Sequence, residues 1–203
     1  MARRAQCVVP GTPNLTEFHV FRWSHRVVWL AACLIAASCD APERGDMVAG
    51  GIAMKTISET LIEAQARGHA HNTAYQGALL PAEAHDLMQR APGAVLVDVR
   101  TRAELDFVGR IPGSVEIEWQ SYPSGQPNEN FVAQLQRQVD REALVMFICR
   151  SGARSHTAAT VAAGAGYTQC YNVLQGFQGD KDAHSHRDSV GGWRHAGLPW
   201  YQA

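Results

Sequence analysis

The chain has 203 residues, with 18 Lys and Arg against 19 Asp and Glu, and a formal net charge of −1. This length suits one globular domain with additional sequence. The balanced charge excludes the basic excess typical of nucleic-acid binding, so no nucleic-acid partner is expected.

Residues 1–39 have the layout of a leader followed by an export signal. Arg22 and Arg26 precede an apolar run over residues 27–37, which is too short to span a bilayer. Small residues then lead to Cys39, as in bacterial lipoprotein signals. Simple cleavage and membrane anchoring through a lipidated Cys39 both remain open, and so does an ordinary N-terminal helix. We expect an exported protein of the periplasm or cell envelope.

Residues 40–76 are polar, small and glycine-bearing, which is typical of a linker. One helix is expected around residues 58–67, and the segment could dock on the domain. His69 and His71 are interpreted as solvated residues because further metal ligands are not close in the sequence. The domain proper is predicted over residues 77–203.

Strands and helices alternate from Gly77 onward, which predicts an α/β fold with a parallel sheet covered on both faces. Ligands of such folds bind at the carboxyl ends of the strands. We expect strands over residues 78–80, 94–99, 114–117, 143–148 and 171–174, and helices over residues 81–90, 101–107, 130–139 and 155–165.

Cys149 stands where a buried apolar strand turns into a helix. The first backbone N–H groups of a helix have no intrahelical acceptor and favour an anion. Arg150 and Arg154 flank the same loop, and Gly152 allows it to turn tightly. The pattern therefore indicates a reactive thiolate. The alternative, an inert buried thiol, would not need these surroundings.

Three motifs resemble the signatures of the rhodanese-type sulfurtransferases. They are the loop Cys149–Ser155, the strand end Asp98–Arg100 with Glu104 and Gly109–Gly113, and the segment Trp193–Pro199. The resemblance covers the predicted domain. It implies a rhodanese-like three-layer fold, in which a central five-stranded, mainly parallel sheet has helices on both faces.

The resemblance also implies a mechanism in which Cys149 is the nucleophile. Its thiolate would take the outer sulfur of thiosulfate or a similar donor, hold it as a persulfide, and pass it to cyanide or a thiol. No cofactor or metal is implied. Asp98, Arg100 and Glu104 would form a structural brace. The loop residues Arg150, Ser151, Gly152, Ala153, Arg154 and Ser155 would bind the substrate.

Three alternatives remain open at this point. Arg154 could bind a structural carboxylate rather than the donor. Cysteine-dependent phosphatases and arsenate reductases have related loops, but their arginine follows the cysteine by six positions, whereas Arg154 follows Cys149 by five. The shorter loop favours a single added sulfur. The third alternative is a non-catalytic rhodanese-type binding module, which usually lacks the cysteine.

Two departures from the family pattern concern Arg110, where histidine is common, and the segment 176–192, which is longer than usual. This segment is expected to be a polar lid over Cys149 or a plain surface loop. Metal binding through His184 and His186, with Asp180 and Asp182 nearby, is the least favoured interpretation.

Two further residues near the site are expected to have no chemical role. Cys170 precedes the last strand while Cys149 ends the fourth, so the two lie at opposite ends of the sheet and do not form a disulfide. His156 falls one turn into the helix, where we expect a packing or surface residue rather than the base of a cysteine protease.

Overall fold

The computed structural model describes residues 55–202. The predicted export segment, Cys39 and the first part of the predicted linker fall outside these residues. None of the helices between Lys55 and Gln202 is both long and apolar enough to cross a membrane.

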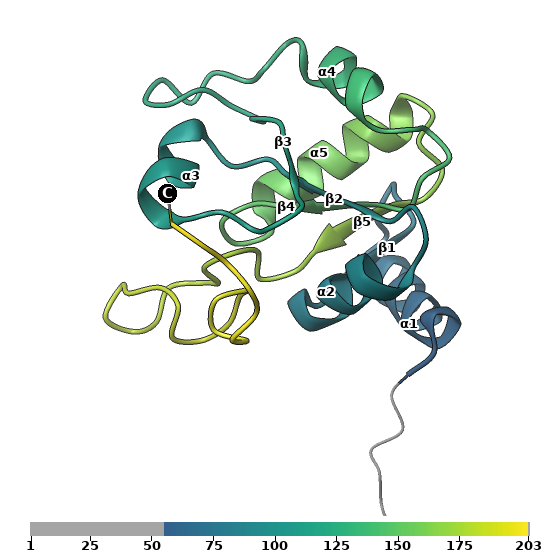
Figure 1. Ribbon diagram of the computed structural model, residues 1–203, viewed down its shortest axis with the longest axis horizontal. Coiled ribbons are helices and arrows are strands. Elements are labelled where there is room, and N and C mark those ends of the chain that lie inside the picture. Colours follow the sequence, from purple (N-terminus) through teal and green to yellow (C-terminus); the bar gives the residue numbers. More distant parts are fainter. Residues whose placement is uncertain (1–54, 203) are drawn as a thin grey trace, which may run out of the picture. The chain divides into compact units, whose positions relative to one another are not determined.

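Five strands form one sheet in the order β1-β5-β4-β2-β3 (Figure 1). Every neighbouring pair runs parallel, which confirms the predicted α/β fold. The strands are short, and their bounds lie within two residues of those predicted. They are β1 Gly77–Leu79, β2 Val95–Asp98, β3 Val115–Glu116, β4 Val145–Ile148 and β5 Cys170–Val173.

Helices cover both faces of this sheet, as predicted (Figure 1). Helices α1 and α2 lie on one face and α4 and α5 on the other, while the short α3 follows β2 at the carboxyl edge. Their bounds are α1 Ile57–Ala70, α2 Pro81–Arg90, α3 Arg102–Val108, α4 Phe131–Gln138 and α5 Ala153–Gly164.

The central strand β4 explains why its sequence is apolar throughout. Val145 and Phe147 belong to the core beneath α4 and α5, whereas Met146 and Ile148 belong to the core beneath α1 and α2. All four side chains are fully buried. A strand covered on both faces has no polar side, so the usual alternation of apolar and polar residues is absent from its sequence. This packing also holds the end of β4, and with it Cys149, in one place.

Helix α1 confirms the helix expected around residues 58–67 of the predicted linker, and it packs on the domain. Thr56 and Glu59 form a capping box at its start. Ala64 is fully buried against the sheet, and the Arg67 guanidinium binds both carboxylate oxygens of Glu83 on α2. The packed part of the chain therefore begins before Gly77.

Helix α5 begins at Ala153, two residues earlier than the predicted start at Ser155. Gly152 is its N-cap and has a left-handed backbone with φ of 96°. Ala153 and Arg154 are good helix formers, so the helix propagates back to this glycine. The turn between β4 and α5 is correspondingly short, and Arg154 and Ser155 belong to the first helical turn.

Candidate active site

Cys149 directly follows β4, and β4 lies between β5 and β2 in the sheet. The Gly152 amide donates a hydrogen bond to the Cys149 sulfur at 3.2 Å. The Ser155 hydroxyl lies 3.3 Å from the sulfur and 3.1 Å from the Gly152 carbonyl, so its single proton can serve either acceptor. Both donors belong to the start of α5, where the helix dipole favours negative charge. The site can therefore hold an anionic sulfur.

The backbone of Gly152 makes this arrangement possible. Its φ of 96° lies in the left-handed region, which side chains other than glycine rarely adopt. This conformation turns the chain from strand to helix within three residues and directs the Gly152 N–H group at the sulfur. The role predicted for Gly152 as a loop-turning residue is thus visible in the geometry.

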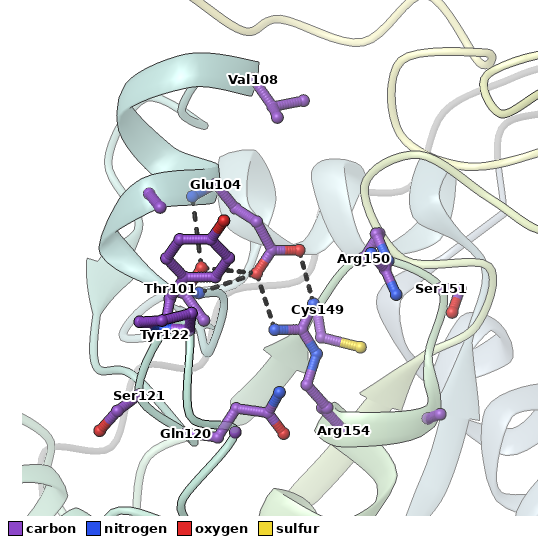
Figure 2. Close-up of a pocket in the computed structure, with 14 residues that line it drawn as sticks. Thr101, Glu104, Val108, Gln120, Ser121, Tyr122, Cys149, Arg150, Ser151 and Arg154 are labelled. Carbon is purple, nitrogen blue, oxygen red and sulfur yellow. Dashed lines mark hydrogen bonds and ion pairs between the residues drawn. The ribbon is translucent and has the colours of Figure 1, made fainter.

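Arg154 points across the site and binds Glu104 of α3 (Figure 2). Its two terminal nitrogens each lie 2.7 Å from one carboxylate oxygen of Glu104, which is bidentate geometry. Binding of a structural carboxylate was one of the two alternatives for Arg154, and the structure shows that contact. Its predicted role in holding a sulfur donor stays a prediction.

The Glu104 carboxylate binds two different partners, Arg154 and Thr101. Besides binding Arg154, it accepts hydrogen bonds from the backbone N–H and the hydroxyl of Thr101, which completes the capping box of α3. Burial raises the pKa of Glu104, but the bonds from Arg154 and Thr101 outweigh it and lower that pKa to about 2. The carboxylate is therefore charged at every ordinary pH, and α3 is tied to α5.

A second ion pair completes the predicted brace. Asp98 and Arg100 are fully buried, and their closest atoms lie 2.6 Å apart. The Arg100 guanidinium also donates to the Gly109 carbonyl and lies 3.8 Å from the centre of the Phe177 ring. A buried charge pair needs such additional partners to offset its desolvation. The pair connects the end of β2 to the end of α3.

A pocket of about 480 Å³ opens over the sulfur (Figure 2). Cys149 is only 1% exposed and lies at its floor, whereas the Arg150 side chain is exposed at its wall. Of the predicted substrate-binding residues, Gly152 and Ser155 contact the sulfur without lining the pocket. The others line it directly, namely Arg150, Ser151, Ala153 and Arg154.

The opposite wall was not predicted from the sequence. It consists of α3 residues and of a turn over residues 120–125, which we call the pocket turn. The sequence showed this turn only as a polar, proline-bearing connection. Its position after a strand of a parallel sheet could have predicted that it lines the site, because such segments begin at the ligand-binding edge. The lining residues of this wall are Thr101, Ala103, Glu104, Val108, Gln120, Ser121, Tyr122, Pro123 and Gly125.

The long segment 176–192, which we call the rear loop, contributes no residue to the pocket lining. It instead contacts the backbone of the loop that carries Cys149. The Phe177 N–H group donates to the Cys149 carbonyl at 2.7 Å, and the Gln178 N–H group donates to the Arg150 carbonyl at 2.9 Å. Within residues 55–202, no group of three or more His, Cys, Asp or Glu side chains is arranged to hold a metal ion.

Cys170 lies toward the opposite end of the sheet from Cys149, and His156 is a surface residue, as predicted. Cys170 pairs with Val145 in the sheet register, so it lies four residues, or about 13 Å, back along the strands from Cys149. Both thiols are free. Burial raises the pKa of Cys170 to about 12. His156 is exposed, and its Nδ1 lies 2.7 Å from the Tyr75 hydroxyl.

The model of one protein family, described as the rhodanese-like domain, matches residues 80–183. Two relatives from Rickettsia are similar to more than half of the chain. The uncharacterized protein RP600 homolog of Rickettsia rickettsii is 36% identical over 122 residues, which are 58% of this chain and 91% of that protein. The uncharacterized protein RC0915 of Rickettsia conorii is 37% identical over 120 residues, with the same two coverages.

A solved structure with high similarity is the crystal structure of Rv0390 from M. tuberculosis. It is 45% identical to this chain, with a TM-score of 0.57. The alignment covers 64% of this chain and 99% of Rv0390. The similarity therefore spans nearly the whole of that protein and about two thirds of this chain.

Proposed function

The chain belongs to the rhodanese-like family, and from this premise we propose that it is a sulfurtransferase that carries sulfur on Cys149. The observation that supports this most directly is the Cys149 sulfur at the floor of an open pocket, hydrogen-bonded by the Gly152 amide at the start of α5. A nucleophilic sulfur needs both access to its substrate and stabilisation of its charge.

The proposed reaction has two half-reactions. In the first, the Cys149 thiolate attacks the outer sulfur of thiosulfate; the new S–S bond forms, the donor's S–S bond breaks, and sulfite leaves with the bonding electron pair. In the second, an acceptor takes the outer sulfur from the persulfide and the Cys149 thiolate is regenerated. The first amides of α5, which lack intrahelical acceptors, would stabilise the charge in both states.

The contact of Arg154 with Glu104 argues against a phosphatase. A phosphatase loop needs its arginine to hold the oxygens of a tetrahedral anion. Here both terminal nitrogens of Arg154 bind the Glu104 carboxylate. A persulfide adds one sulfur to Cys149 and makes no such demand on Arg154, so sulfur transfer fits the observed hydrogen bonds better.

Formation of thiocyanate from thiosulfate and cyanide tests the proposal. We expect Cys149→Ser to lower this rate at least 1,000-fold, because a hydroxyl cannot carry the sulfur as a persulfide. The control is Cys170→Ala, which removes the other buried thiol of the domain and should change the rate less than twofold. Folding of each variant is checked by circular dichroism.

Two results would contradict sulfur transfer. No thiocyanate formation by folded wild-type protein would favour the non-catalytic binding module. Hydrolysis of an aryl phosphate that depends on Cys149, without turnover of thiosulfate, would favour the phosphatase.

A further inference from the structure

Ser155 is fully buried beside the Cys149 sulfur, but it does not line the pocket above that sulfur. Any part that Ser155 takes in the reaction is therefore exerted on the sulfur and not on a bound substrate. Resting on the proposed function, we propose that Ser155 is a catalytic residue of the second half-reaction only. Its hydroxyl stabilises the charge that returns to the Cys149 sulfur when the persulfide gives up its outer sulfur.

The Ser155 hydroxyl has two acceptors within reach and one proton to donate. Its oxygen lies 3.3 Å from the Cys149 sulfur and 3.1 Å from the Gly152 carbonyl oxygen. A hydrogen bond to a charged acceptor is stronger than one to a neutral acceptor. The proton therefore points to the sulfur when the sulfur is a thiolate, and to the carbonyl when the sulfur is neutral.

The Gly152 carbonyl does not depend on this hydroxyl. It also accepts the His156 N–H group at 3.0 Å, which is the first helical hydrogen bond of α5. Turning the hydroxyl toward the sulfur therefore leaves no buried carbonyl without a donor. Turning it back costs little once the sulfur is neutral, because a neutral sulfur is a weak acceptor. Ser155 can thus change acceptor during the reaction while the helix stays intact.

The two donors to the Cys149 sulfur differ in how they respond to a change of charge. The Gly152 N–H group lies 3.2 Å from the sulfur, and its direction is fixed by the backbone. The Ser155 O–H bond rotates about the bond from Cβ to Oγ, so its proton follows the better acceptor. The amide therefore donates to the sulfur in every state of the enzyme, whereas the serine donates to it only when it is charged.

The charge on the Cys149 sulfur changes in opposite directions in the two half-reactions. During loading, the thiolate gives an electron pair to the new S–S bond and loses its charge, sulfite leaves, and the outer sulfur carries the charge of the persulfide. During transfer, the acceptor binds the outer sulfur, the S–S bond to Cys149 breaks, and its electron pair returns to Cys149 as a thiolate. Neither step needs an oxidant, a reductant or a proton.

A donor that responds to charge on this sulfur has opposite effects on the two rates. A thiolate leaves faster when its charge is stabilised, and it attacks more slowly for the same reason. Ser155 therefore speeds the transfer of sulfur to the acceptor and slightly slows the loading of sulfur from the donor. A serine that only supported the start of α5 would affect both steps alike.

Ser155→Ala tests this assignment in the full chain, with each half-reaction followed in a single turnover. Loading is measured as sulfite released from thiosulfate without an acceptor. Transfer is measured as thiocyanate formed when cyanide is added to the loaded protein after removal of thiosulfate. Both rates are taken at a pH where alkylation of Cys149 by iodoacetamide has reached its maximum rate in both proteins.

We expect transfer to slow about fivefold or more in Ser155→Ala, because a charge-assisted hydrogen bond to the leaving sulfur is lost. Loading should stay equal to the wild type or rise by up to about threefold. The pH at which alkylation reaches half its maximum rate should rise by about one pH unit, because the thiolate is less stabilised.

Thr160→Ala is the matched control. The Thr160 hydroxyl also donates to a carbonyl one turn back on α5, that of His156 at 2.9 Å, but the Cys149 sulfur is hydrogen-bonded by Gly152 and Ser155. Both half-reactions of this control should stay within about twofold of the wild type.

Three results with Ser155→Ala would overturn the assignment: equal slowing of both steps, no change in either step, or slower loading alone. If the wild type still forms thiocyanate in those cases, the sulfurtransferase proposal stands. If the folded wild type forms none, that proposal fails, and with it the role of Ser155 in transfer. The alkylation profiles of the two proteins then show separately whether Ser155 stabilises the thiolate.

Discussion

The pocket turn and the rear loop differ in what they contact, although each follows a strand at the carboxyl edge of the sheet. The pocket turn follows the edge strand β3 and lines the space above Cys149. The rear loop follows β5 and hydrogen-bonds the main chain of Cys149 and Arg150 from behind. Length and polarity therefore do not show which loop lines the pocket; the position of its strand relative to β4 does.

The rear loop is itself anchored to the C-terminal segment. The Trp193 N–H group donates to the Gly176 carbonyl at 2.8 Å, and the Arg194 N–H group donates to the Phe177 carbonyl at 3.1 Å. Trp193 and Phe177 are fully buried. The loop carrying Cys149 is thus supported by residues 176–178, which are in turn supported by residues 192–194. We expect substitutions in the rear loop to change the position of Cys149. Substitutions in the pocket turn should instead change which substrates react.

The largest effect that separates the two regions is expected from Gly176→Ala. A Cβ atom there would lie 2.4 Å from the Cys149 carbonyl oxygen and 2.6 Å from the Arg150 carbonyl carbon, so the backbone must move. We predict a loss of about 3 kcal/mol in the free energy of unfolding, of the size found for other buried steric conflicts, and at least a 30-fold fall in kcat/KM with every acceptor. Urea unfolding and thiocyanate formation measure the two effects.

Gly197→Ala is the matched control for this substitution. Gly197 also has a left-handed backbone, with φ of 68° against 59° for Gly176, but no atom lies within 4 Å of its added Cβ. In Gly197→Ala, backbone strain should lower the free energy of unfolding by only about 1 kcal/mol, and the activity should stay within twofold of the wild type. Equal losses of activity in both variants would show that support of the Cys149 loop by the rear loop does not matter.

An intermediate effect is expected from Glu104→Gln, which breaks the contact between the pocket walls. The amide cannot form the bidentate ion pair with Arg154, and we predict a loss of about 2 kcal/mol at pH 7, discounted for partial exposure of the pair. In the wild type, the lowered pKa of Glu104 stabilises the fold fully above about pH 4.5. That contribution is lost as the pH falls toward about 2.

Denaturant unfolding between pH 7 and pH 2.5 measures this pH dependence. The variant Glu59→Gln is the control, because Glu59 forms the same kind of capping box with Thr56 on α1 but is hydrogen-bonded to no arginine of residues 55–202. Its effect on stability should be clearly smaller. If Glu104→Gln and Glu59→Gln unfold alike at every pH, the ion pair contributes nothing beyond the helix cap.

The smallest effect is expected from shortening the tip of the rear loop, by replacing residues 182–189 with two glycines. The Asp182 carboxylate accepts hydrogen bonds from the His184 and His186 N–H groups and from the Ser189 hydroxyl, all within the deleted tip. We predict a small fall in Tm and less than a twofold change in the rate of thiocyanate formation. A larger change in that rate would make the tip a lid over the pocket.

Most elements were predictable because their signals are local. Pro81 at the first helical position indicated α2 at its observed bounds, and the Thr101–Glu104 pattern indicated the start of α3. Helix α1 was also expected, but its packing against the sheet was harder to predict than the helix itself. Its buried stripe consists of Thr60, Ala64 and Gly68, small residues that pack closely but produce little apolar periodicity.

The sequence by itself determined the centre around Cys149: a buried strand, Cys149, a glycine and a helix start are neighbours along the chain. Only the tertiary structure decided what surrounds that centre. Glu104 and Arg154 are 50 positions apart and meet because β2 and β4 are adjacent strands. The pocket turn reaches Cys149 for the same reason, since β3 pairs with β2. Strand order depends on packing between distant segments, which no local pattern records.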